Sequence, residues 1–139
     1  MNNKYEAMVL SCIDPRFQHK VFSYLSRRKL RGKYSSFTIA GAAVGVTHAN
    51  FKKWQKTFIE NLETSIQMHK INKLIVINHK DCGAAKLVNV KKQFNDINEN
   101  KIHRESFQRL KKIIIKKFPK LYYEFHIMTL KGSIKSFDA

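Results

Sequence analysis

The feature that most constrains the fold is a continuous apolar run near the middle of the chain, Lys73-Leu74-Ile75-Val76-Ile77-Asn78. Its length suits a β-strand and is far below the roughly 20 residues that a membrane-spanning helix needs. Because the run does not alternate apolar with polar residues, we expect both of its faces to be buried. Strands of this kind lie inside parallel sheets that are covered by helices. The run therefore predicts an α/β fold.

Further strand-like and amphipathic segments alternate along the chain. We expect strands at 7–13, 36–40 and 123–130, and helices at 17–30, 51–66, 84–92 and 107–118. Asn50 is a suitable N-cap for the second helix, while 41–45 and 95–100 are predicted as connections. Alternation of strands and helices is typical of a parallel sheet. We predict a single α/β domain over residues 1–139, with a mainly parallel sheet of about four strands in the order 2-1-3-4 and helices on both faces.

The composition excludes several classes of protein. Hydrophobic residues make up 43% of the chain, which is enough to build a core and excludes an intrinsically disordered protein. No segment approaches the length of a membrane span, and the amino terminus lacks the apolar centre of a signal peptide. We therefore expect a cytoplasmic protein with no membrane partner.

The chain is strongly basic, with 27 Lys and Arg against 10 Asp and Glu and a net charge of +17. Basic runs at 26–33 and 111–120 are typical of phosphate-binding surfaces. However, aromatic residues do not alternate with these cations, and no nucleic-acid-binding motif is present. An excess of amino acids with A- and T-rich codons also explains the charge without any ligand. Nucleic acid is therefore not the expected partner.

Two cysteines follow two of the expected strands and have polar neighbours. The patterns are Cys12-x-Asp14-x-Arg16 and His79-x-x-Cys82-Gly83. Because the carboxyl ends of parallel strands share one edge of a sheet, Cys12, His79 and Cys82 converge if their strands are neighbours. Two thiolates and one imidazole suit Zn²⁺ and leave a fourth coordination position open. A disulfide, or two small core residues, are the alternatives for the cysteine pair.

The two motifs together resemble the signature of the β-class carbonic anhydrases. The matching segments are Cys12-Ile13-Asp14-Pro15-Arg16 and His79-Lys80-Asp81-Cys82-Gly83-Ala84, and Ala40-Gly41 matches a small pair after the family's second strand. The resemblance covers most of the chain between Ala7 and Gly132 and identifies a short, divergent member of this family.

The resemblance implies a zinc-dependent lyase that hydrates carbon dioxide reversibly to bicarbonate through a zinc-bound hydroxide. It implies that Cys12, His79 and Cys82 hold the zinc. Asp14 would then orient the hydroxide, and Arg16 would hold Asp14 ionised and away from the metal. The family also has a closed state in which the aspartate is the fourth ligand. The resemblance further implies a homodimer or higher homo-oligomer.

The chain departs from the family pattern in three places. Thr38-Ile39 stands where the family usually has Arg-Asn, and Asn78 stands where Gly is usual. Only eleven residues precede Cys12, so the helical arm of longer members is not expected. These departures leave open a divergent zinc-binding homologue that acts on another small molecule, such as carbon disulfide, or that has no activity. The remaining histidines are expected at the surface or in strands and not at the metal: His19, His48, His69, His103 and His126.

Overall fold

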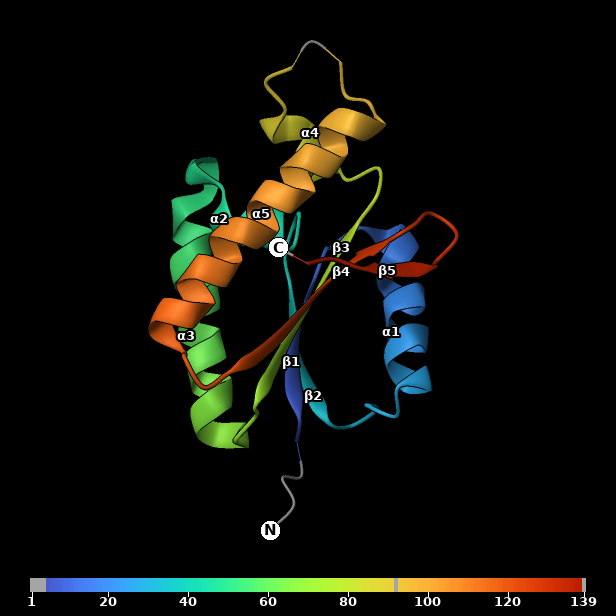
Figure 1. Ribbon diagram of the computed structural model, residues 1–139. Helices are drawn as coiled ribbons and strands as arrows, with labels where there is room; N and C mark the ends of the chain where they lie inside the picture. Colours follow the sequence, from blue (N-terminus) through green and yellow to red (C-terminus); the bar gives the residue numbers. More distant parts are fainter. Residues whose placement is uncertain (1–4, 92, 139) are drawn as a thin grey trace.

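A five-stranded sheet forms the centre of the computed structural model, which describes residues 5–91 and 93–138 (Figure 1). The strand order is β2-β1-β3-β4-β5, in which the first four strands are parallel and β5 is antiparallel to β4. The predicted order 2-1-3-4 is confirmed, and a fifth strand is added in the tail. The strands are β1 (Ala7–Ser11), β2 (Tyr34–Thr38), β3 (Lys73–His79), β4 (Tyr122–Met128) and β5 (Ile134–Ser136).

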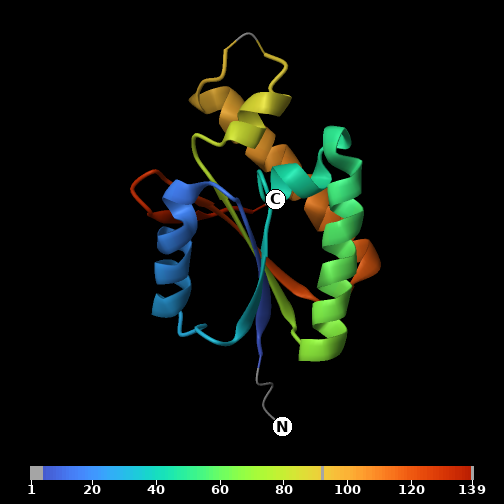
Figure 2. The same ribbon diagram turned by 180° about the vertical axis from the view of Figure 1, so that it is seen from behind.

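Helices cover both faces of this sheet, as predicted. Helix α1 lies on one face, whereas α2, α3 and α5 lie on the other, and α4 lies beyond the carboxyl end of β3 (Figures 1 and 2). The helices are α1 (Gln18–Arg27), α2 (Ala43–Thr47), α3 (Lys52–His69), α4 (Gly83–Val88) and α5 (Asp96–Lys117), with short 3₁₀ turns η1 (Pro15–Phe17) and η2 (Ala49–Phe51).

Two expected connections are partly helical. The small-residue segment 41–45 leads into α2, which is buried throughout. The polar segment 95–100 contains the start of α5, where the Asn95 side chain accepts a hydrogen bond from the amide of Asn98 at 2.9 Å. Asn95 therefore acts as an N-cap and satisfies one of the amides that lack a partner within the helix.

Three expected helix boundaries are also corrected. Asn50 lies inside η2 and donates its amide to His48, so it does not cap α3, which begins at Lys52. Helix α1 ends at Arg27, and left-handed Lys29 (φ 62°) follows it. Helix α4 ends at Val88, before the expected end at Lys92, and Lys92 lies outside the described residues.

The alternation of side chains in β1 divides the core into two parts. Met8 and Leu10 pack in a large cluster with residues of α3 and α5, whereas Ala7 and Val9 pack in a smaller cluster with residues of α1. All four side chains are buried because helices cover both faces of the sheet at β1. Direct pairing of β1 with β3 places their carboxyl ends side by side.

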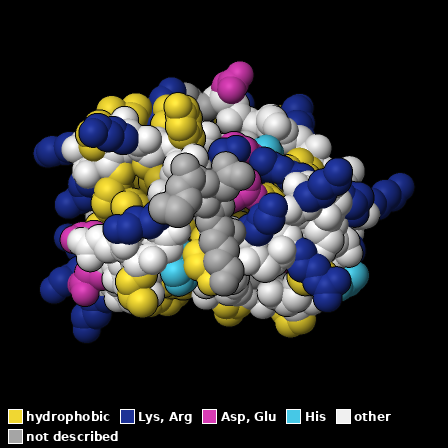
Figure 3. All heavy atoms as spheres, turned by 90° about the horizontal axis from the view of Figure 1, so that it is seen from below, with side chains coloured by type: hydrophobic (Ala, Val, Ile, Leu, Met, Phe, Trp, Pro, Cys, Tyr) yellow, Lys and Arg dark blue, Asp and Glu magenta, His cyan; other side chains and the backbone are white. Residues whose placement is uncertain are grey.

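Positive side chains are spread widely over the one face of the molecule that Figure 3 shows. Figure 3 shows the face at the amino ends of the parallel strands, where Lys and Arg side chains lie at many separate places around the rim. Among the described residues, no helix has both the length and the apolar character needed to cross a membrane.

Candidate metal centre

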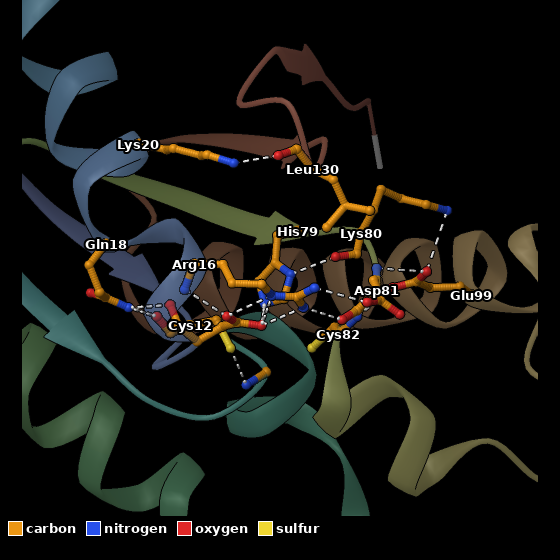
Figure 4. A network of polar contacts seen from close by, with 12 residues as sticks. Cys12, Arg16, Gln18, Lys20, His79, Lys80, Asp81, Cys82, Glu99 and Leu130 are labelled. Atoms are coloured by element: carbon orange, nitrogen blue, oxygen red, sulfur yellow. Dashed lines mark hydrogen bonds and ion pairs between the residues drawn. The ribbon is translucent and has the colours of Figure 1, made fainter.

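Cys12, His79 and Cys82 converge at the carboxyl edge of the sheet. Cys12 directly follows β1, His79 is the last residue of β3, and Cys82 precedes α4. One candidate ligand atom from each residue lies within 4.8 Å of those of the other two. All three residues are buried, and Figure 4 shows the two cysteines on either side of the imidazole. The predicted juxtaposition is confirmed, because β1 and β3 pair directly.

The imidazole of His79 is oriented with one nitrogen toward the cluster. Its Nδ1 donates to the carbonyl oxygen of Lys80 at 2.7 Å, which leaves Nε2 as the unprotonated nitrogen of the neutral ring. The ring stacks on Phe17, with centroids 4.1 Å apart. His79 Nε2 is buried and has no hydrogen-bond partner among the described residues. A buried polar atom without a partner is costly, and a metal ion at this position would remove that cost.

The two thiols are electrostatically coupled. The Cys82 thiol is the main cause that lowers the pKa of Cys12 to about 4, and the Gly41 amide, 3.2 Å from Cys12 Sγ, contributes. The same contact with Cys12, together with burial, raises the pKa of Cys82. One thiolate therefore forms easily, while the second resists ionisation next to it. A divalent cation would compensate both charges, and two sulfurs with one imidazole nitrogen are a donor set that Zn²⁺ prefers.

Asp14 and Arg16 form an ion pair at the edge of the cluster. The Asp14 side chain caps η1 by accepting the amide of Arg16 at 2.9 Å. The Arg16 guanidinium also donates to both Asp14 oxygens, at 3.1 Å from Nε and 2.8 Å from Nη2. These contacts lower the pKa of Asp14 to about 2. Asp14 Oδ2 lies 3.8 Å from His79 Nε2, so the carboxylate borders the space between the three side chains.

The structure adds two polar residues, Asp81 and Gln18, to those predicted for this site. Arg16 binds Asp81 as well as Asp14, through the Asp81 carboxylate and its carbonyl oxygen, both at 3.0 Å. Gln18 donates to the carbonyl oxygens of Cys12 and Asp14, at 2.9 and 2.8 Å, and so holds the turn after β1. Asp81 lies inside the second motif, and this position in the sequence indicates a place at the site. Gln18 is one polar residue of an amphipathic helix and carries no such signal.

The other histidines lie outside the cluster that can hold a metal ion, as expected. Their predicted locations are only partly correct. His126 is in a strand, where its ring is 2.8 Å from Glu124. His103 is fully buried on α5, so its expected place at the surface or in a strand is wrong. It is retained there because both of its ring nitrogens have polar partners, Asn78 and Glu99.

A family model described as "Putative carbonic anhydrase" matches residues 1–125 of the chain. An uncharacterized protein of Rickettsia bellii is 26% identical over 134 residues, which are 96% of this chain and 82% of the relative.

Solved β-carbonic anhydrases have the same fold. The enzyme CcaA superposes with a TM-score of 0.64 at 15% identity, covering 99% of this chain and 81% of CcaA. One of two tetrameric enzymes from Sordaria macrospora gives a TM-score of 0.59 at 11% identity, covering 99% of this chain and 83% of that enzyme. At these identities the superpositions establish the fold, and the chemistry has to be argued from the residues of this chain.

Proposed function

Since this chain belongs to the family described as "Putative carbonic anhydrase", we propose that it catalyses the zinc-dependent, reversible hydration of carbon dioxide to bicarbonate. One observation carries the proposal: the buried Nε2 atom of His79, which has no hydrogen-bond partner among the described residues, lies beside two cysteine sulfurs. This arrangement leaves a polar atom unsatisfied in the metal-free protein and satisfies it when zinc is held.

In this proposal Cys12, His79 and Cys82 hold the zinc. A zinc ion held in this way supplies an acidified water as the nucleophile for carbon dioxide. His79 binds through Nε2 because the Lys80 carbonyl oxygen accepts the proton on Nδ1. The Gly41 amide stabilises the Cys12 thiolate from the side of the second strand.

Asp14 and Arg16 act on the nucleophile and not on the metal. The Asp14 carboxylate accepts a hydrogen bond from the attacking water and so directs a lone pair of its oxygen toward carbon dioxide. Arg16 keeps this carboxylate ionised and holds both of its oxygens. These hydrogen bonds from Arg16 also oppose movement of the Asp14 carboxylate onto the metal, which would fill the fourth coordination position.

We also propose that the protein works in the cytoplasm as a homodimer or higher homo-oligomer. The tetrameric Sordaria macrospora enzymes with this fold support the assembly. Sedimentation equilibrium should therefore give at least twice the mass of one chain, and a monomer at micromolar concentration would contradict the assembly.

Zinc content and carbon dioxide hydration test the proposal together. We expect about one zinc per chain, with stopped-flow hydration by the wild type that is lost in Cys82→Ser and His79→Asn. Asp14→Asn should keep the zinc and lose at least about 100-fold in kcat/KM, because the carboxylate no longer accepts the hydrogen bond.

Two matched variants control for the change of residue type. His19→Asn alters an exposed histidine on α1, and Asp138→Asn alters an exposed aspartate after β5, so both should keep full activity. Wild-type protein with less than about a tenth of a zinc per chain would refute the metal site. Full zinc occupancy without hydration between about pH 6 and 9 would refute carbon dioxide as the substrate and favour a divergent homologue. Carbon disulfide is then the next substrate to assay.

A further inference from the structure

A buried carboxylate lies directly behind the loop that carries Cys82. Glu99, in the first turn of α5, is only 4% exposed. Its Oε1 accepts the amide of Asp81 and its Oε2 accepts the amide of Cys82, both at 3.0 Å. Figure 4 shows Glu99 beside this loop. A buried charge is costly unless both of its oxygens are satisfied, and here consecutive backbone amides satisfy them.

A chain of buried side chains fixes the orientation of Glu99. His103 Nε2 is 3.1 Å from Glu99 Oε2, and His103 Nδ1 is 2.8 Å from the side-chain nitrogen Nδ2 of Asn78. Asn78 Oδ1 accepts the amide of Ala43 at 3.0 Å, so the other atom of its side-chain amide is the NH₂ donor to His103. His103 Nδ1 is therefore the acceptor, and Nε2 carries the proton that is donated to Glu99. The network thus links α2, β3 and α5 to the Cys82 loop.

The loop needs this support because its backbone is unusual. Asp81 has a φ of +58°, a left-handed backbone conformation that residues other than glycine adopt at a cost. That turn brings Cys82 back toward His79 over only two intervening residues. Glu99 binds the two amides of the turn, while Arg16 binds the Asp81 carbonyl oxygen and carboxylate from the other side.

We propose that Glu99, oriented by His103 and Asn78, is a positioning residue that holds the Lys80–Cys82 loop in the conformation that presents Cys82 to the metal. The inference rests on the proposed function, because it takes the cluster of Cys12, His79 and Cys82 as the zinc site. Glu99 touches neither the metal position nor the substrate. It acts through the peptide amides of Asp81 and Cys82.

Glu99→Gln is the direct test, because it keeps the shape of the side chain and removes one of its two acceptors. The new NH₂ group faces a peptide N–H, so one of the two loop amides loses its partner. We expect the Kd for zinc, measured by competition with a chromophoric chelator, to rise about 10- to 100-fold. With cobalt in place of zinc, the thiolate-to-metal charge-transfer absorption should weaken or shift.

Glu105→Gln is the matched control. It removes the same charge from the same helix, but the Glu105 side chain is only half-buried and its carboxylate lies no nearer than 4.0 Å to Lys101 and Arg109. We expect wild-type zinc affinity and a wild-type cobalt spectrum. Equal zinc affinities and cobalt spectra for the two variants would overturn the proposal, even if Glu99→Gln lowered the melting temperature, because a purely structural role predicts only the latter.

Amide hydrogen exchange of the zinc-free wild type tests the same contact without any substitution. The amides of Asp81 and Cys82 should exchange slowly although they lie in a loop, because Glu99 accepts both. Exchange as fast as that of exposed loop amides would overturn the proposal. Zinc binding is measured apart from catalysis, so a wild type that binds zinc and does not hydrate carbon dioxide refutes the proposed reaction and leaves the result on Glu99 readable.

Discussion

Replacing Gly45 with alanine tests how closely α2 packs against the turn that supports Cys12. A Cβ atom added at Gly45 would lie 2.0 Å from the carbonyl oxygen of Ala40 and 3.1 Å from its carbonyl carbon. Both contacts are with backbone, which cannot rotate away as a flexible side chain can. Ala40 and Gly41 form the turn between β2 and α2, and the Gly41 amide donates to Cys12 Sγ.

The size of the effect follows from two opposing contributions. The helix or the turn must move by more than about 1 Å to restore ordinary contact, and overpacking of a buried site costs about 1–3 kcal/mol. We take about 3 kcal/mol because rigid backbone lies on both sides of the contact. Alanine recovers about 1 kcal/mol of helix propensity relative to glycine. The net destabilisation is about 2 kcal/mol, or roughly 8 °C in Tm for a chain of this length.

Urea unfolding of the zinc-free protein measures this loss without a contribution from metal binding. Gly83→Ala is the comparison, because among the described residues, its chain neighbours and its own helix backbone apart, no heavy atom lies within 4 Å of a Cβ added at Gly83, and its φ is not in the positive range. That variant should be unchanged or up to about 1 kcal/mol more stable. A Gly45→Ala protein at least as stable as the wild type would refute the reasoning, because helix propensity alone predicts that result.

Three other substitutions test the core, a helix cap and an ion pair. Phe107→Ala removes a fully buried ring from the core and should cost about 3–5 kcal/mol in urea unfolding, so a loss below about 1.5 kcal/mol would contradict the packing. Asn95→Ala removes the cap of α5 and should cost about 1 kcal/mol, visible as a lower Tm by circular dichroism; an unchanged Tm would argue against the cap. Hydrogen bonds from His126 and then Arg28 hold the pKa of Glu124 below its usual range. The contribution of the Glu124 carboxylate to the stability of the folded protein is therefore complete above about pH 4.3 and is lost as the pH falls through the lowered pKa. Glu124→Gln should therefore cost about 1 kcal/mol at neutral pH and progressively less in acid, and a loss that does not change with pH would contradict this sign.

The strands could be predicted from apolar patterning, because the side chains of inner strands are buried on both faces of a sheet that helices cover. The run at 73–78 is β3 almost to the residue, and β3 lies between β1 and β4 as its lack of polar positions requires. The order near the centre followed from the two motifs, which are useful chemically only if β1 and β3 are neighbours. Pairing of Ala7 with Lys73 and of Ser11 with Ile77 confirms this.

The elements that were missed depend on contacts that local sequence does not encode. Helix α2 contains small and β-branched residues in Ala43–Thr47 and has no amphipathic period, since all of its residues are buried. Strand β5 has only three residues, of which two are exposed, and it forms by antiparallel pairing with β4. Both elements owe their structure to neighbouring elements, and tertiary contacts of this kind override local propensity.

The three candidate metal ligands could likewise be predicted from local sequence, whereas the buried residue that supports their loop could not. The convergence of Cys12, His79 and Cys82 could be predicted, because thiols and an imidazole at neighbouring strand ends have a chemical reason to lie together. Glu99 lies in a mainly polar stretch that suits a solvated surface, and nothing local indicates that its carboxylate is buried.

Asn78 directly precedes the candidate ligand His79 and also contacts His103 in the buried network behind the Cys82 loop. Its place before His79, where the resembling family usually has glycine, marks it as a departure in the sequence, and in the structure it is the residue that binds His103 and Ala43. A glycine at this position would leave the ring of His103 without its partner on β3, and the orientation of Glu99 would then depend on α5 alone. In this chain, the residue that departs from the motif contacts a buried histidine, which in turn contacts a buried carboxylate. The effects of substitutions at Asn78, His103 and Glu99 should therefore not add, because a change of one alone already leaves a buried polar group without its partner.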